Sequence, residues 1–268
     1  LQIPLPDLEK QRRIADFLDD QVTRIDQAIQ LRERQIDSLL SRYLAEWDEG
    51  ARKLSAQFGI VRLRRVLRSI TDGPFGSSLT SAHYTESGTR VIRLGNIGRG
   101  EFLPEDEAYI AEEYGRTLRQ HSVAAGDLII AGLGDERRPL GRCAIVPDNL
   151  GPAIVKADCY RVRLNESISM PFAAWFLSSP LAESHIRLFS RGATRARLNT
   201  DVVRDAPVTL PSWSIQEGTV RCWARSRDVH ASTTSSLRRS IELLEERKRA
   251  LITAAVTGEF DVSSASVR

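Results

Sequence analysis

Cysteine, methionine and long apolar runs are scarce in this chain of 268 residues. The three cysteines, Cys143, Cys159 and Cys222, lie far apart and lack the paired C-x-x-C spacing of a zinc site or a redox motif. No segment approaches the roughly 18 consecutive apolar residues that a membrane helix needs, and no basic-then-apolar signal segment opens the chain. We therefore expect a soluble, cytoplasmic protein with buried or free thiols, no bound metal and no membrane partner.

Lysine is also scarce, although the net charge of +3 is too small to indicate nucleic acid by itself. Only 4 of the 38 basic residues are Lys, at positions 10, 53, 156 and 248, and the rest are Arg. The planar fork of arginine suits paired hydrogen bonds to guanine edges and phosphates. GC-rich codon usage would give the same bias, so the arginine content supports DNA binding without establishing it.

Catalytic motifs are absent as well. Arg137 occupies the third glycine position of an otherwise nucleotide-like turn. Asp148 and Lys156 resemble half of a nuclease motif, but Ile154 stands where a metal site needs its second carboxylate. No G-x-x-x-x-G-K-[ST] loop is present for ATP, and no Asn-Pro-Pro-aromatic or Asp-Pro-Pro-aromatic sequence for methyl transfer to a flipped base. The sequence thus predicts a protein that is not an enzyme.

What the chain does contain is a repeat of its two ends. The segment from residue 5 aligns without a gap to the segment from residue 210, and each copy runs from a Leu-Pro pair into a long helical pattern. The matched pairs include Leu5 with Leu210, Pro6 with Pro211, Gln11 with Gln216, Arg34 with Arg239, Ile36 with Ile241 and Leu39 with Leu244.

Both copies carry a narrow apolar stripe with heptad spacing. The predicted seam consists of Leu18, Val22, Ile25, Ile29, Ile36 and Leu39 in the first copy, and Trp223, Leu237, Ile241, Leu244 and Leu251 in the second. A stripe this narrow on a long helix needs another helix as its partner, so we predict an antiparallel coiled coil. The alternative is two amphipathic helices packed on the surface of one domain.

The middle of the chain has short β-branched runs and frequent Gly and Pro, which favours a compact mixed α/β domain. The fold class is therefore α+β, with this domain flanked by the two long helices. The predicted divisions are a first helical region over 1–52, the domain over 60–208, a second helical region over 209–260 and a flexible tail over 261–268. We predict strands over 89–94, 127–131, 143–146, 153–155 and 160–164, and short helices over 111–119, 171–176 and 181–189.

Four glycine-containing loops of this domain carry side chains able to hold phosphates or read base edges. The loop over 190–199 is the strongest candidate, because three arginines surround small residues with no acidic residue among them, although a solvated loop can carry three arginines without any contact. The candidate DNA-binding residues are Ser77, Ser78, Arg93, Asn96, Arg137, Arg138, Arg142, Lys156, Arg191, Thr194, Arg195, Arg197 and Asn199.

Several segments together resemble the specificity subunits of Type I restriction-modification systems. Residues 11–19 (QRRIADFLD) and 251–259 (LITAAVTGE) are similar to the conserved helical regions of that family. Residues 72–78 (DGPFGSS), 93–97 (RLGNI), 152–158 (PAIVKAD) and 191–199 resemble its target-recognition domains. The resemblance covers nearly the whole chain, and the order of these moderately specific motifs agrees with the repeat.

The resemblance implies a non-catalytic subunit that reads one half of a split double-stranded DNA target and positions modification and restriction subunits. S-adenosylmethionine, ATP and Mg are then expected on partner subunits, and no cofactor on this chain. One recognition domain between two conserved regions implies either part of a full subunit, which the missing Met favours, or a half-length subunit that pairs with a second copy. The alternative function is a protein-binding coiled-coil scaffold that does not bind DNA.

Overall fold

The computed structural model describes residues 7–135, 138–188 and 197–257. It divides into two compact units: the first comprises residues 1–43 and 226–268, and the second comprises residues 44–225. Two long helices, α1 (Leu8–Phe58) and α6 (Trp213–Thr257), each contribute to both units. The predicted flexible tail over 261–268 lies outside the described residues.

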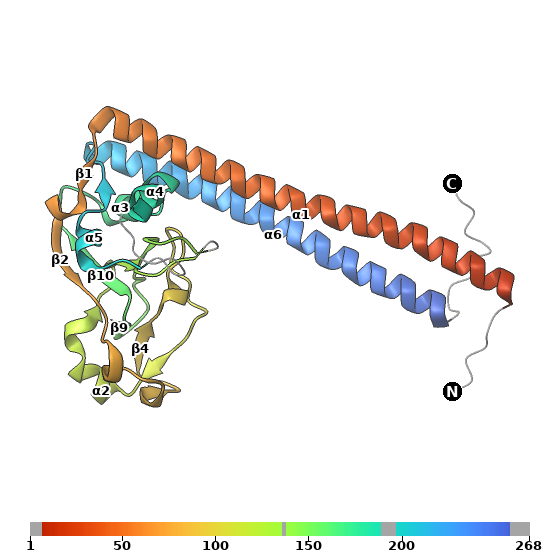
Figure 1. Ribbon diagram of the computed structural model, residues 1–268, viewed down its shortest axis with the longest axis horizontal. Coiled ribbons are helices and arrows are strands. Elements are labelled where there is room, and N and C mark those ends of the chain that lie inside the picture. The colour runs from red at the N-terminus through yellow and green to blue at the C-terminus, as the bar shows by residue number, and fades with distance from the viewer. Residues whose placement is uncertain (1–6, 136–137, 189–196, 258–268) are drawn as a thin grey trace. The chain divides into compact units, whose positions relative to one another are not determined.

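Figure 1 shows α1 and α6 side by side. No proline interrupts either helix, and the less exposed positions follow heptad spacing, for example Leu18, Val22, Ile25 and Ile29. Within the first unit, the side chain of Lys248 binds Asp26 (Nζ to Oδ1, 2.7 Å) and His230 stacks on Tyr43 with ring centroids 4.8 Å apart. Moving from Asp26 to Tyr43 along α1, the contacted residue on α6 moves back from Lys248 to His230. The two helices are therefore antiparallel, as predicted.

The seam is apolar, with polar positions inside it. The side chain of Ile25 is 5% exposed, and the other predicted seam residues are partly buried. Ala15 is exposed, so the buried stripe on α1 begins after it. Thr234 and Lys248 occupy heptad positions of α6 on either side of Ile241. Polar groups in a seam fix the register of two helices more strictly than apolar packing alone.

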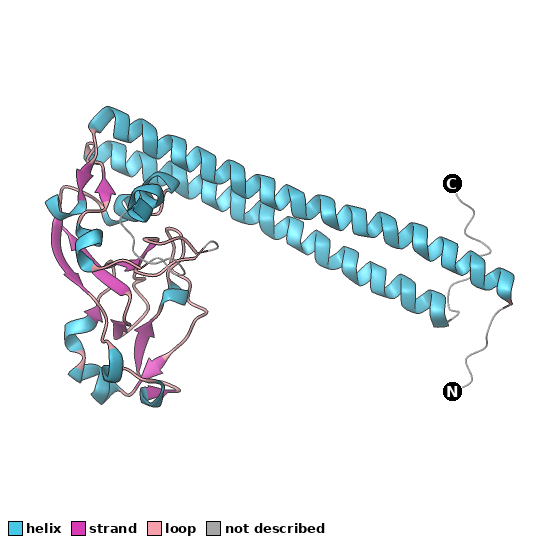
Figure 2. Cartoon of the chain, in the orientation of Figure 1, coloured by secondary structure: helices cyan, strands magenta, loops and turns pink. Residues whose placement is uncertain are grey.

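The second unit combines three sheets with short helices, as Figure 2 shows. The strands are β1 (Val61–Arg62), β2 (Leu67–Thr71), β3 (Tyr84–Thr85), β4 (Thr89–Ile92), β5 (Tyr109–Ile110), β6 (Ser122–Val123), β7 (Leu128–Ala131), β8 (Cys143–Ile145), β9 (Ala153–Val155), β10 (Cys159–Leu164) and β11 (Pro207–Val208). The helices are α2 (Glu112–Thr117), α3 (Met170–Leu177), α4 (Pro180–Leu188) and α5 (Thr200–Arg204), with short 3₁₀ turns between elements. The fold class predicted from the sequence is confirmed.

The sheet order explains which loops meet. One sheet has the order β2-β10-β7-β8 with antiparallel neighbours, and the other has the order β3-β5-β4-β9-β6, in which β4 and β9 are parallel. The strands β1 and β11 form a separate pair. Since β2 and β10 pair, the loop after β2 and the turn before β10 lie at the same end of the sheet.

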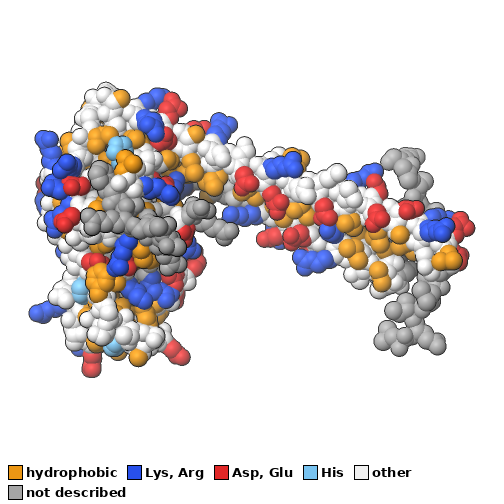
Figure 3. All heavy atoms as spheres, in the orientation of Figure 1, with side chains coloured by type: hydrophobic (Ala, Val, Ile, Leu, Met, Phe, Trp, Pro, Cys, Tyr) orange, Lys and Arg blue, Asp and Glu red, His pale blue; other side chains and the backbone are white. Residues whose placement is uncertain are grey.

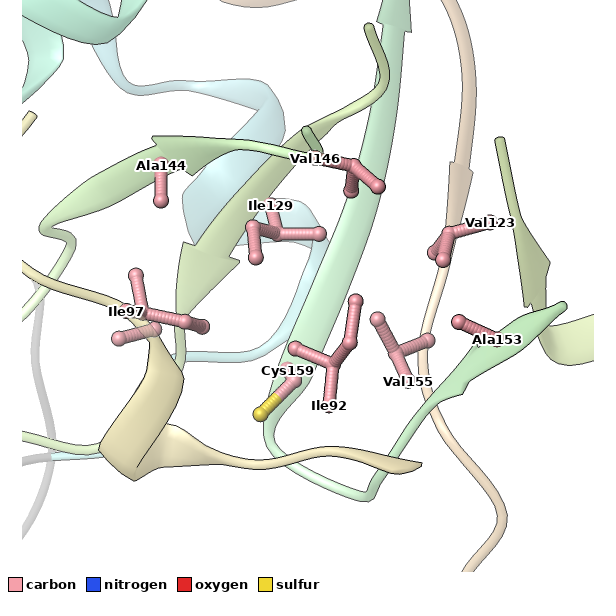
Figure 4. Packing of buried hydrophobic residues seen from close by; sticks show 10 residues of the cluster. Ile92, Ile97, Val123, Ile129, Ala144, Val146, Ala153, Val155 and Cys159 are labelled. Carbon is pink, nitrogen blue, oxygen red and sulfur yellow. The ribbon is translucent and has the colours of Figure 1, made fainter. Parts of the chain in front are cut away.

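A buried apolar core lies between the two larger sheets (Figure 4). Ile92 from β4 and Val155 from β9 are fully buried in it beside Ile129 from β7. Cys143 and Cys159 are buried, and burial raises the pKa of both thiols, while Cys222 is exposed. This core holds the strand ends, and therefore the loops, in fixed positions.

The ends of the two long helices differ from the predicted ends of the helical regions. The predicted domain divisions themselves stay a prediction. Helix α1 runs to Phe58, beyond the expected end at residue 52, and α6 begins at Trp213. The boundary between the two compact units falls inside both long helices, after residue 43 in α1 and after residue 225 in α6. Trp47 of α1 and Trp223 of α6 belong to the second unit, where their rings lie 5.4 Å apart and Trp47 Nε1 donates to the carbonyl oxygen of Trp175. No described helix has the length and apolarity needed to cross a membrane.

Candidate DNA interface

The loop from Asp72 to Ser78 follows β2 and is held at its base by backbone packing. A Cβ on Gly73 would lie 2.0 Å from the carbonyl carbon of Lys156, so only glycine permits this approach. Asp72 Oδ1 accepts hydrogen bonds from Gly73 N (2.7 Å) and Asp158 N (3.1 Å). His121 Nδ1 donates to the carbonyl oxygen of Asp72 (2.6 Å). The start of the loop is thereby fixed.

The tip of this loop is exposed although its far end is also anchored. Tyr114 OH donates to the carbonyl oxygen of Ser78 (2.6 Å). Phe75 is 49% exposed, and Gly76 takes a left-handed φ of 59°. Ser77 and Ser78 are exposed in a 3₁₀ turn. A loop pinned at both ends presents an aromatic ring and two hydroxyls to solvent at little cost in conformational entropy.

Arg197 lies against this loop from a distant part of the chain. Its Nε donates to Asp158 Oδ1 (2.8 Å), and its guanidinium carbon lies 5.7 Å from the centroid of the Phe75 ring. Asp158 in turn donates its backbone N–H to Asp72. We call these four residues, Asp72, Phe75, Asp158 and Arg197, the Arg197 cluster.

A cavity of about 720 Å³ opens beside the Arg197 cluster. It is lined by Asp72, Phe75, Tyr160, Arg197, Leu198, Asn199, Thr200, Asp201, Val202 and Asp205. Tyr160 OH donates to the carbonyl oxygen of Leu198 (2.7 Å), which ties the segment carrying Arg197 to β10. Figure 3 shows basic side chains next to hydrophobic ones on one face of this unit, with acidic ones among them.

Burial governs the electrostatics of Asp72. Loss of solvent raises the pKa of its carboxyl from 3.8 to about 6, against the opposing effect of the two backbone N–H donors. The charged groups nearby are Asp158, which raises this pKa further, and Arg197, which lowers it. Among the described residues, no group of His, Cys, Asp and Glu could hold a metal ion.

The raised pKa of Asp72 predicts a pH-dependent contribution to stability. The folded state binds the proton more tightly than the unfolded chain, so stability falls as pH rises from about 4 to about 6. One pKa unit corresponds to about 1.4 kcal/mol, and because the side chain is half-buried, screening reduces the total to about 1–2 kcal/mol.

We therefore expect Asp72→Asn, which keeps an oxygen acceptor for both backbone donors, to raise the free energy of unfolding at pH 7 by about 1–2 kcal/mol. The gain should shrink toward zero at pH 4 when unfolding by urea is compared with the parent chain. Asp148→Asn, which removes a carboxylate at an exposed position, serves as the control and should change the free energy of unfolding by less than about 0.5 kcal/mol. If Asp72→Asn and the parent chain differed in free energy of unfolding by the same amount at pH 4 and pH 7, the raised pKa of Asp72 would be contradicted.

The structure brings only some of the predicted DNA-binding residues to this surface. Arg197 and Asn199 line the cavity, and Ser77 and Ser78 lie on the adjoining loop. Asn199 also begins α5, where its Oδ1 accepts from Val202 N (2.9 Å). Lys156 Nζ lies over the Tyr84 ring at 5.5 Å, and Arg138 is exposed in a separate loop beside a smaller cavity.

Two candidates are corrected by their burial. Asn96 is fully buried, where its Nδ2 donates to the carbonyl oxygens of Leu103 and Asp106. Arg142 is 4% exposed, and its guanidinium donates to five backbone carbonyls, including Ile97 O at 2.6 Å. Side chains with their donors used inside the core cannot reach a base, so both are structural.

Arg93 lies between the exposed candidates and the buried ones. Its side chain is 34% exposed, and a terminal nitrogen is paired with the Asp106 carboxylate. Arg137, Arg191, Thr194 and Arg195 lie outside the described residues.

Sequence reasoning missed three members of the Arg197 cluster. The exposed ring of Phe75 could have been found from its place between Pro74 and Gly76, since such a loop cannot bury an aromatic by local packing. Asp158 has a φ of 64°, rare for a residue with a side chain, and this is visible only in the structure. Asp72 stood in a recognised motif, but its partner Asp158 is far along the chain.

Two solved structures share this fold. The chain aligns over 96% of its length, with a TM-score of 0.70 and 17% identity, to a chain from a study of complex assembly and conformational transition of the type I restriction-modification system. It aligns over the same share, with a TM-score of 0.53 and 17% identity, to the HsdS subunit from Thermoanaerobacter tengcongensis. It covers 62% and 60% of those chains.

A curated relative gives the same result from sequence. The chain is 21% identical over 98% of its length to the Type I restriction enzyme MjaVIII specificity subunit of Methanocaldococcus jannaschii, of which it covers 63%. No protein-family model matches the chain. The resemblance to Type I specificity subunits is thus confirmed in sequence and fold.

Proposed function

We propose that this chain acts as a DNA-specificity subunit, or as part of one, in a Type I restriction-modification complex. The observation that carries the proposal is the match to a specificity subunit over 98% of the chain. In this proposal, the domain over 60–208 binds one half of a split double-stranded DNA target. The exposed residues of the pinned loop and of the segment after residue 196 provide the contacts.

The helix pair provides the second part of the function, which is to position other subunits. Leu31 and Leu40 on α1 and Leu243 on α6 lie outside the seam and are 54%, 45% and 49% exposed. Large apolar side chains exposed on a long helix pair suit a subunit interface. We propose that modification subunits bind this pair and that restriction subunits join through the complex.

Catalysis then belongs to the partners. The sequence carries no ATP loop, methyl-transfer motif or complete metal motif, which agrees with a non-catalytic role. S-adenosylmethionine, ATP and Mg would be bound by partner subunits. This chain would supply the DNA sequence preference and position those subunits on the DNA.

The proposal predicts salt-dependent DNA binding by an assembled complex. The chain is copurified with a modification subunit and titrated with genomic DNA fragments at 50 and 200 mM salt. With about two to four phosphates neutralised, affinity should fall about 10- to 150-fold between the two salt concentrations. Sequence-selective binding that is weakened by salt supports the proposal. A complex that assembles but does not bind DNA would favour the protein-binding scaffold.

A further inference from the structure

The Arg197 cluster leaves one particular edge of its arginine open. Nε is taken by Asp158 Oδ1 at 2.8 Å, and the described part of the chain gives the two terminal nitrogens no hydrogen-bond partner. The Arg197 side chain is 53% exposed. The two terminal nitrogens can donate two parallel hydrogen bonds to a pair of acceptors. Guanine presents such a pair, N7 and O6, in the major groove.

The guanidinium is held before any ligand binds. The Asp158 carboxylate is 14% exposed and is fixed from behind, because its own backbone N–H binds Asp72 Oδ1. Asp158 keeps a left-handed φ of 64°, a strained conformation that persists where surrounding contacts require it and that is common at binding sites. An arginine oriented in this way loses little side-chain entropy on binding.

The local charge disfavours a phosphate as the ligand of this edge. The carboxylate of Asp158 offsets much of the charge of Arg197, and Asp72, Asp201 and Asp205 line the same cavity. A phosphate needs net positive charge, whereas a neutral base edge needs a donor pair of fixed geometry. The guanidinium carbon lies over the Phe75 ring, which shields that side of the group from solvent.

We propose that Arg197 reads a single guanine of the recognised half-site through its terminal nitrogens, with Asp158 as its positioning residue and Phe75 as its cover. This inference rests on the proposed function, because it requires that the domain bind DNA. It adds the base that is read and the residues that read it.

The test is selection of binding sites from a randomised double-stranded DNA library by the full chain, alone and together with the modification subunit. The parent chain should enrich a motif that contains a guanine at a defined position. Arg197→Lys keeps the charge but removes the fork, and should lower the preference for that guanine about 5- to 150-fold while the rest of the motif is retained. Arg116→Lys, at an exposed position of α2 that is not among the candidate DNA-binding residues, is the matched control and should leave the motif unchanged.

Two variants at Asp158 separate positioning from folding. Glycine accepts a φ of 64° but removes the carboxylate, and asparagine tolerates this φ and keeps an oxygen acceptor for Arg197 Nε. Asp158→Gly should weaken the guanine preference, and Asp158→Asn should retain most of it. A purely structural role would change total affinity in both variants and leave the base preference intact.

The outcomes distinguish this inference from the proposed function. A motif that keeps its guanine preference in Arg197→Lys overturns the reading of guanine by Arg197, while the DNA-specificity function stands. A parent chain that enriches no motif, alone or with the modification subunit, overturns both.

Discussion

Replacing Gly73 with alanine should abolish sequence-selective DNA binding and lower the free energy of unfolding by about 1–3 kcal/mol. The added Cβ would lie 2.0 Å from the carbonyl carbon of Lys156 and 2.2 Å from its oxygen, and both belong to backbone that cannot rotate away. The loop would have to leave the turn before β10, which separates Phe75 from Arg197. Urea unfolding and DNA titration measure the two effects.

The control for this change is the same substitution at Gly218 in α6, where an added Cβ meets nothing within 4 Å. In a helix, alanine is favoured over glycine by up to about 1 kcal/mol, so Gly218→Ala should fold at least as well as the parent chain and bind DNA equally. Equal behaviour of Gly73→Ala and Gly218→Ala would show that the loop does not depend on this close approach.

Replacing Leu244 with aspartate should separate the helix pair and prevent assembly with the modification subunit. Leu244 is a partly buried seam position of α6, and a charge there loses apolar contact and is poorly solvated, at a cost of about 2–3 kcal/mol. Thermal unfolding followed by helical circular dichroism, together with pull-down of the modification subunit, would detect the loss.

The neighbouring residue offers a matched control, since Leu243 is 49% exposed and points out of the seam. Leu243→Asp adds the same charge one position away and should leave the stability of the helix pair within about 0.5 kcal/mol of the parent chain. It is a control for stability alone, because Leu243 belongs to the proposed subunit interface and its replacement should weaken assembly without loosening the helix pair. Retained assembly and stability in Leu244→Asp would mean that the seam does not hold the two helices together.

The strands that the sequence predicts well are those whose apolar character is local. The runs over 128–131 and 153–155 are buried along their whole length, so their composition alone indicates buried strands. Strand β2 was not predicted, because Arg68 and Ser69 give it no clear alternation and its place depends on pairing with β10. The long helices were predictable because a repeat and a heptad pattern reinforce each other.

The candidate interface was less predictable because it depends on contacts between distant residues. Arg197 and Asn199 were found from composition, but Asp158 acquires its role only by pairing with Arg197 across the fold. Asn96 and Arg142 show the opposite case: glycine-rich surroundings suggested exposed loops, whereas backbone carbonyls take up their donors inside the core. A sequence does not show which polar side chain satisfies its own fold and which remains free for a ligand.

The most direct test of the central claim is to map methylated bases in genomic DNA from cells that express the modification subunit with and without this chain. A DNA-specificity function predicts a single recurring split motif that is methylated only when the chain is present, and that changes at one position in Arg197→Lys. Methylation that follows no motif, or that is the same without the chain, would contradict it.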